Sequence, residues 1–140
     1  MKIKKTVALC MSFFAALAVS QTSVADEVWD SSYGKVVYEA DIGKIALWNY
    51  DNKGTLGLIY IDNLAGVYSH RGSYKGYWIQ ENSEVKCKKQ RMMKDKPTFY
   101  WGKFHITFLD PSFPSRWQAK WSYCDKAPKE NWDGTPVVGN

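Results

Sequence analysis

Residues 44–61 read KIALWNYDNKGTLGLIYI, and this stretch decides the fold class. Lys44 to Tyr50 and Thr55 to Ile61 are both rich in aromatic and β-branched residues, which favour strands. Between them, Asp51-Asn52-Lys53-Gly54 offers a tight turn, because Asn and Gly accept a positive φ. The stretch therefore predicts a β-hairpin.

Short β-rich runs of the same kind recur in both directions from this hairpin, and no long stretch has apolar residues at helical spacing. The further predicted strands are Tyr33 to Tyr38, Ala65 to Ser69, Ser73 to Gln80, a segment around Cys87, Thr98 to Leu109 and Arg116 to Cys124. Residues 125–140, rich in Pro, Gly, Lys and Asn, are expected to form an irregular tail. Seven or eight strands without helices indicate an all-β, antiparallel fold.

Glycines inside the predicted strands favour a small up-and-down barrel, with a β-sandwich as the alternative. They stand at Gly34, Gly57, Gly76 and Gly102. A glycine within a strand marks a bend or bulge, and repeated bends allow a sheet to close.

The first 25 residues have the features of a secretory signal. Met1 to Lys5 contains three lysines, and Val7 to Val19 contains one serine and no charge. This run is shorter than the roughly 20 residues that span a bilayer, and Ser23-Val24-Ala25 supplies the small residues of a cleavage site. We expect cleavage after Ala25, export to the periplasm or beyond the cell, and one mature domain over residues 26–140.

Cleavage would remove Cys10 and leave Cys87 and Cys124. An exported protein meets an oxidising compartment, so these two are expected to form a disulfide. The removed segment also carries three lysines and no acid, which leaves sixteen basic residues against fourteen acidic ones, a net charge of +2 instead of +5. So small a charge does not indicate a nucleic-acid partner.

Three aromatic segments have a layout that is similar to a known family. They are Trp29 to Val36 (WDSSYGKV), Ser73 to Trp78 (SYKGYW), and Trp101 to Phe108 followed by Phe113, Trp117 and Trp121. Together they resemble the opening, central and closing strands of small exported bacterial β-barrels of the avidin-like and related calycin type. The resemblance implies such a barrel over most of residues 29–124, and it carries over no ligand-contacting residue.

The chain holds seven tryptophans, more than a small core requires. Most are expected to fill the barrel, and one or two to line a pocket at an open end. We predict Trp48, Trp78 and Trp101 as ligand-binding residues, with Tyr60 nearby through hairpin pairing. The leading hypothesis is a non-enzymatic exported binding protein that holds a small apolar or glycan ligand in or at the mouth of the barrel.

The segment Lys86 to Lys96 is predicted to be an exposed basic loop. Its cations are Lys86, Lys88, Lys89, Arg91, Lys94 and Lys96, with a single acid among them. In the alternative hypothesis, these cations contact an anionic surface or an acidic envelope protein. The protein would then be a protein–protein effector, such as an enzyme inhibitor or an immunity-type protein. A solvated loop without a partner is the third interpretation.

No catalytic or metal-binding arrangement is predicted. Cys87 and Cys124 together with His70 and His105 lack the spacing of zinc ligands. Neither histidine has a surrounding motif that would place a nucleophile, and most aspartates stand in turn signals. We expect no enzyme activity, cofactor or metal, and no transmembrane segment in the mature chain.

Overall fold

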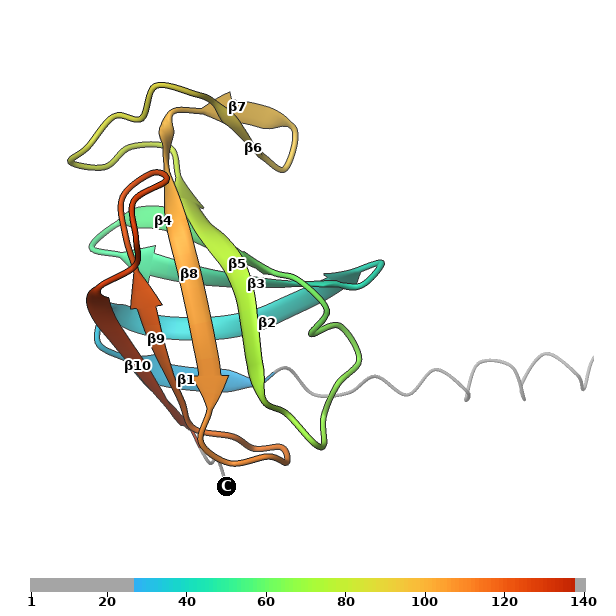
Figure 1. The fold of residues 1–140 in the computed structure, drawn as a ribbon. Coiled ribbons are helices and arrows are strands. Elements are labelled where there is room, and N and C mark those ends of the chain that lie inside the picture. The colour runs from blue at the N-terminus through green and yellow to red at the C-terminus, as the bar shows by residue number, and fades with distance from the viewer. Residues whose placement is uncertain (1–26, 138–140) are drawn as a thin grey trace, which may run out of the picture.

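The computed structural model describes residues 27–137, which form an all-β domain. Eight strands close an antiparallel barrel in the order β1-β10-β9-β8-β5-β4-β3-β2, and β6 and β7 form a separate hairpin (Figure 1). The strands are β1 (Val28–Ser31), β2 (Gly34–Ile42), β3 (Ile45–Asn52), β4 (Thr55–Ile61), β5 (Ser73–Gln80), β6 (Arg91–Met93), β7 (Lys96–Thr98), β8 (Tyr100–Phe108), β9 (Trp117–Trp121) and β10 (Glu130–Pro136). Among these residues, no helix is long and apolar enough to cross a membrane. The predicted signal segment 1–25 lies outside the described residues.

The predicted barrel and the hairpin predicted over residues 44–61 are confirmed. β3 and β4 pair from Ala46↔Ile61 to Asn52↔Thr55. Lys53 and Gly54 at the tip have φ values of 53° and 93°, and the Gly54 amide donates a 2.7 Å hydrogen bond to the Asp51 carboxylate. The local turn chemistry therefore sets the register of the hairpin as the sequence predicted.

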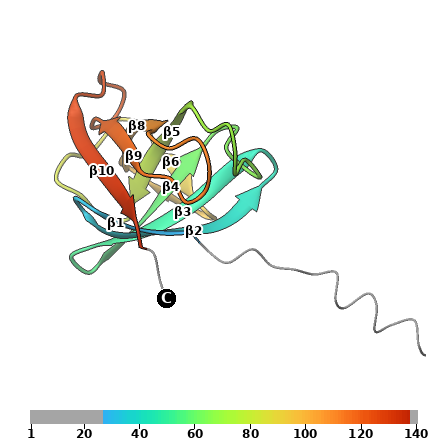
Figure 2. The ribbon, with the colours of Figure 1, turned by 90° about the horizontal axis from the view of Figure 1, so that it is seen from below.

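Barrel closure depends on β1 and β10, neither of which is among the strands predicted from the β-rich runs of the sequence. β1 pairs with β10 from Trp29↔Pro136 to Ser31↔Gly134 (Figure 2). The prediction of an irregular tail was wrong for Glu130–Pro136, because this segment pairs with β9 on one side and with β1 on the other. Its backbone groups form hydrogen bonds with β1 and β9, which its turn-like composition does not predict.

Two other predicted strands are absent from the described structure. Ala65 to Ser69 lies in the connection between β4 and β5, where the Val67 amide bonds to the Leu64 carbonyl in a turn. Cys87 lies in the connection between β5 and β6, outside any strand. The predicted strand Thr98 to Leu109 is divided between the end of β7 and β8.

Aromatic rings fill one half of the barrel interior. Trp29 lies 4.4 Å from Trp48 and 6.1 Å from Trp117, measured between ring centroids, and all three are fully buried. Gly134 on β10 leaves space for them, since a Cβ there would come within 2.3 Å of the Trp117 ring. This half of the barrel is a packed core.

The same end of the barrel is closed by a buried ion pair. Arg71, from the β4–β5 connection, donates hydrogen bonds of 2.9 and 3.0 Å to the Glu27 carboxylate and one of 3.0 Å to the Ser115 hydroxyl. Leu64 packs into the core beneath the connection. The β4–β5 and β8–β9 connections thus close the end at which β1 begins and β10 ends.

A second apolar layer covers the outside of β3, β4, β5 and β8. The connection between β5 and β8, residues 81–99, folds back over this face and includes the β6–β7 hairpin (Figure 1). The buried residues of this apolar layer come from the four strands and from the connection: Leu47, Leu58, Tyr60, Ile79, Cys87, Met93 and Trp101. The predicted disulfide is present: Cys87 and Cys124 join with an S–S distance of 2.04 Å and fasten the connection to the segment after β9.

Candidate functional site

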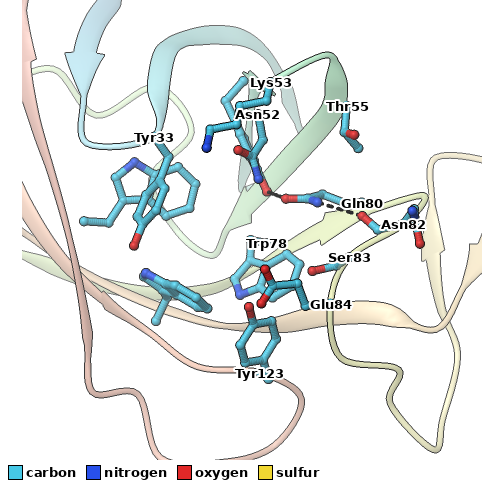
Figure 3. Close-up of a pocket in the computed structure, with 13 residues that line it drawn as sticks. Tyr33, Asn52, Lys53, Thr55, Trp78, Gln80, Asn82, Ser83, Glu84 and Tyr123 are labelled. Atoms are coloured by element: carbon cyan, nitrogen blue, oxygen red, sulfur yellow. Dashed lines mark hydrogen bonds between the residues drawn. The ribbon is translucent and has the colours of Figure 1, made fainter.

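A cavity of about 540 Å³ opens at the end of the barrel opposite the Arg71–Glu27 pair. The β1–β2 and β3–β4 turns, the segment after β5 and the β9–β10 connection surround it. We call it the mouth cavity. It is lined by Tyr33, Tyr50, Asn52, Lys53, Thr55, Trp78, Gln80, Asn82, Ser83, Glu84, Trp121, Tyr123 and Trp132 (Figure 3). Its volume falls in the range of small-molecule sites, about 300–1,000 Å³.

Six of these residues form a continuous series of rings, the aromatic arc, in which neighbours meet edge to face. Along it, Trp132 lies 4.9 Å from Tyr50 and 5.1 Å from Tyr33 between ring centroids. Trp121 continues the series, 5.8 Å from Tyr33, 5.1 Å from Tyr123 and 5.9 Å from Trp78. Edge-to-face pairs are favourable in themselves and hold each ring in a fixed orientation.

Hydrogen bonds fix two of the three indoles of the aromatic arc further, whereas the buried Nε1 of Trp121 has no partner among the described residues. Nε1 of Trp78 donates to the Ser122 carbonyl at 2.9 Å, and Nε1 of Trp132 donates to the Ser31 hydroxyl at 2.9 Å. Gly102 permits the first contact, since a Cβ there would lie 1.7 Å from the Ser122 carbonyl oxygen and 2.6 Å from Nε1 of Trp78. The arc is therefore preorganised before any ligand arrives.

The other seven lining residues form a polar wall: Asn52, Lys53, Thr55, Gln80, Asn82, Ser83 and Glu84. Gln80 is the last residue of β5. Its Oε1 accepts a 2.8 Å hydrogen bond from the Tyr50 hydroxyl, and its Nε2 donates one of 2.8 Å to the Asn82 carbonyl (Figure 3). With both ends of its amide held, Gln80 has a fixed orientation in the wall.

Two charged side chains lie on opposite sides of the mouth cavity. Lys53 stands at the tip of the β3–β4 hairpin, whereas Glu84 faces the hydroxyl of Tyr123 beside Trp78 (Figure 3). Burial, together with the negative charge of Glu84, raises the pKa of Tyr123 above its ordinary value. Tyr123 therefore keeps its proton and remains a hydrogen-bond donor at neutral pH.

The four predicted ligand-binding residues do not come together. Trp78 lines the mouth cavity, whereas Trp48 is buried in the packed half of the barrel. Trp101 and Tyr60 point outward, into the layer beneath residues 81–99. There the Tyr60 hydroxyl accepts a hydrogen bond from the Lys94 amide, and Nε1 of Trp101 donates one to the Lys89 carbonyl.

Most cations of the predicted basic loop are engaged by neighbouring side chains. Lys94 pairs with Glu39 at 3.2 Å, and Lys96 pairs with Glu81 at 2.8 Å. The guanidinium of Arg91 lies 4.3 Å from the Tyr77 ring and 4.5 Å from the Trp101 ring.

Three cations of the loop remain. The ammonium of Lys86 lies 4.8 Å from the Phe99 ring. Lys88 and Lys89 are exposed and make no ion pair within residues 27–137. The segment is thus a covering layer with two free charges rather than a uniform basic surface.

The two histidines lie away from the mouth cavity. His70 is in the β4–β5 connection, and its ring nitrogen lies 3.3 Å from the Ser69 hydroxyl. His105 is on the outer face of β8, between Lys75 and Lys120 on the paired strands; partial burial and the nearby Lys75 and Lys103 charges lower its pKa. Within residues 27–137, no group of three or more His, Cys, Asp or Glu side chains is placed to hold a metal ion.

Sequence analysis missed most of the mouth cavity. Trp121 and Tyr123 lie in the last predicted strand, Arg116 to Cys124, but a strand prediction does not say which end of the barrel its residues occupy. Trp132 lies in the segment that was expected to form an irregular tail, and nothing in the sequence pattern marks Glu84 as a site residue. The sequence did contain one usable signal for the site. These residues lie near strand ends, and successive turns of an up-and-down barrel lie at alternate ends, so counting the turns indicates which residues share one end.

Comparison of the chain with protein-family models, with curated proteins and with solved structures finds no match. The mouth cavity is therefore judged on its own geometry and chemistry.

Proposed function

We propose that the protein is a non-enzymatic binding protein whose mouth cavity holds a small glycan. The observation that supports this most directly is the composition of the lining. Six residues are tyrosine or tryptophan, seven are polar or charged, and none of the thirteen is aliphatic. A ligand that fits both walls has a flat, weakly polar face and an edge rich in hydrogen-bonding groups, which describes a sugar ring.

A purely apolar ligand suits this lining less well. It would cover the amides of Asn52 and Asn82 and the charges of Lys53 and Glu84 without replacing their hydrogen bonds to water, and unpaired buried polar groups are costly. Sugar hydroxyls can both donate to and accept from such groups, while the aromatic arc covers the ring face. Of the two ligand classes considered, the glycan is the better match.

The ligand would lie at the mouth of the barrel and not deep inside it. The rings of Trp29, Trp48 and Trp117 are buried and fill the barrel interior away from the mouth. The binding surface is therefore shallow and open, which suits the terminal unit of a larger glycan as well as a free sugar.

The alternative hypothesis, an envelope effector acting through the basic loop, has weaker support. Of its six cations, only Lys88 and Lys89 are free of an ion pair or an aromatic ring, as described above. Export to the periplasm or beyond remains part of the proposal, and the Cys87–Cys124 disulfide agrees with an oxidising compartment.

Intrinsic fluorescence tests the proposal, because three of the seven tryptophans line the cavity. Titration with the disaccharide of N-acetylglucosamine and with maltose should change the emission in a saturable way, whereas palmitate should not. Trp121→Ala should weaken binding by about fivefold or more, because removal of the aromatic face that covers the sugar ring should cost at least about 1 kcal/mol.

The matched control is Trp101→Phe, which alters a tryptophan outside the barrel and should leave affinity unchanged. Saturable binding of palmitate in place of the sugars would contradict the glycan proposal. Equal loss of sugar binding in both variants would place the site elsewhere.

A further inference from the structure

We infer that the mouth cavity selects a sugar that carries a positively charged amino group, and that Glu84 is the residue that recognises this charge. This inference rests on the proposed function and makes it more specific. Its basis is the position of a carboxylate against the aromatic arc, together with the absence of a basic partner for it in the described structure.

Glu84 is one of the acids of residues 27–137 that have no basic partner, and it lines the mouth cavity. Glu27, Asp30, Glu39, Glu81 and Asp110 each form an ion pair with Lys or Arg at 3.5 Å or less. Glu84 forms none within residues 27–137, although it lines a cavity. A positively charged ligand group would therefore meet a carboxylate that holds no Lys or Arg and whose neighbour is the Tyr123 hydroxyl.

The surroundings of Glu84 suit a cation. Trp78 and Tyr123 lie beside its carboxylate (Figure 3), with ring centroids 5.8 Å apart, and Trp121 adjoins both. A cation over an aromatic face is attracted by the ring quadrupole, and a hydrogen bond between an ammonium group and a carboxylate is about twice as strong as a neutral one. Glu130 adds a second negative charge near Tyr123.

Lys53 gives the mouth cavity a positive side opposite the negative side at Glu84. It lies across the mouth from Glu84 (Figure 3), so a positive ligand group is attracted to one side and repelled from the other. An amino group attached directly to a ring that stacks on the arc can satisfy this arrangement in one orientation. An N-acetylated sugar has the same ring but lacks the charge.

The test compares the glucosamine disaccharide with its N-acetylated counterpart at pH 6, where the free amines are protonated. The unmodified protein should bind the charged disaccharide at least about tenfold more tightly, as a charge-assisted hydrogen bond predicts. Glu84→Gln should reduce this preference to less than twofold, because the amide keeps the size of the side chain and removes its charge. The preference should also shrink when the salt concentration rises, since Glu84 is exposed.

Asp62→Asn is the matched control, because it removes one negative charge beyond the opposite end of β4 and should keep the full preference. Equal affinity for the two disaccharides, or a preference that persists in Glu84→Gln, would overturn the inference and leave the glycan proposal standing. If neither disaccharide changes the fluorescence or produces heat in calorimetry, both proposals fail.

Discussion

The hydroxyl of Tyr50 donates a 2.8 Å hydrogen bond to Oε1 of Gln80, and this contact joins β3 to β5 across Gly57 of β4, in the lining of the mouth cavity. Tyr50 is almost fully buried, and burial raises its pKa far above its ordinary value. The phenol thus remains a hydrogen-bond donor at any pH at which the domain is studied.

Replacement of this phenol should destabilise the domain. Tyr50→Phe removes the donor and leaves the Gln80 oxygen unpaired, so the free energy of unfolding should fall by about 1–2 kcal/mol. Urea unfolding followed by fluorescence measures the change. Tyr74→Phe is the control, since the Tyr74 hydroxyl accepts only a long, exposed contact of 3.4 Å from the Gly72 amide. A loss in Tyr50→Phe no larger than that of the control would contradict the role assigned to the contact.

Removal of Arg71 should cost more than removal of the whole ion pair. Arg71→Met leaves the Glu27 carboxylate buried without its cation, and such changes destabilise by about 3–5 kcal/mol. In Arg71→Met/Glu27→Gln no unpaired charge remains, so part of the loss should be recovered. Thermal unfolding of the two single variants and the double variant forms a double-mutant cycle. Additive losses would show that the two side chains do not stabilise the closed end together.

Loss of the disulfide should affect both stability and the mouth. The bridge closes a segment of 37 residues, which corresponds to about 3–4 kcal/mol in the chain-entropy model. Cys124 directly follows Tyr123, and Cys87 follows Glu84 by three residues, so two lining residues should also lose their fixed positions. Cys87→Ser/Cys124→Ser should therefore melt at a lower temperature and bind sugar more weakly. An unchanged melting temperature would contradict the first expectation.

Acid should weaken the β8–β9 connection through Asp110. Hydrogen bonds from Arg116 lower the pKa of this carboxyl to about 2, below its ordinary value. A depressed pKa in the folded state stabilises the protein above the unfolded pKa of about 4, and this contribution disappears as the pH falls to about 2. The difference in melting temperature between the unmodified protein and Asp110→Asn should shrink over that interval. A constant difference from pH 6 to pH 2 would argue against it.

The sequence predicted the fold class because its signals are local. Asp51 to Gly54 specify a turn, and the alternation from Trp117 to Trp121 specifies a buried face; both depend on neighbouring residues alone. β10 was missed for the complementary reason. Its sequence, ENWDGTP, has turn-forming composition, and it becomes a strand because β1 and β9 supply partners distant in the sequence.

The candidate site was less predictable than the fold. Alternation assigns Trp48 and Trp78 to the inner face, yet it does not show that one lies in the filled half and the other at the mouth. Trp101 fell on the opposite face from Phe104 in the same strand, and only the covering by residues 81–99 explains why so large a ring is buried there. Position along the barrel axis depends on the register between strands, which no single strand encodes.

The pairing of β1 with β10 also affects how readily the chain can aggregate. In the closed sheet every strand has a neighbour on both sides, so no row of free amides and carbonyls is left to recruit another molecule. A chain that stops before Glu130 would lack β10, and β1 and β9 would then be unpaired edge strands. We expect such a product to self-associate by strand addition, so β10 protects the barrel from aggregation.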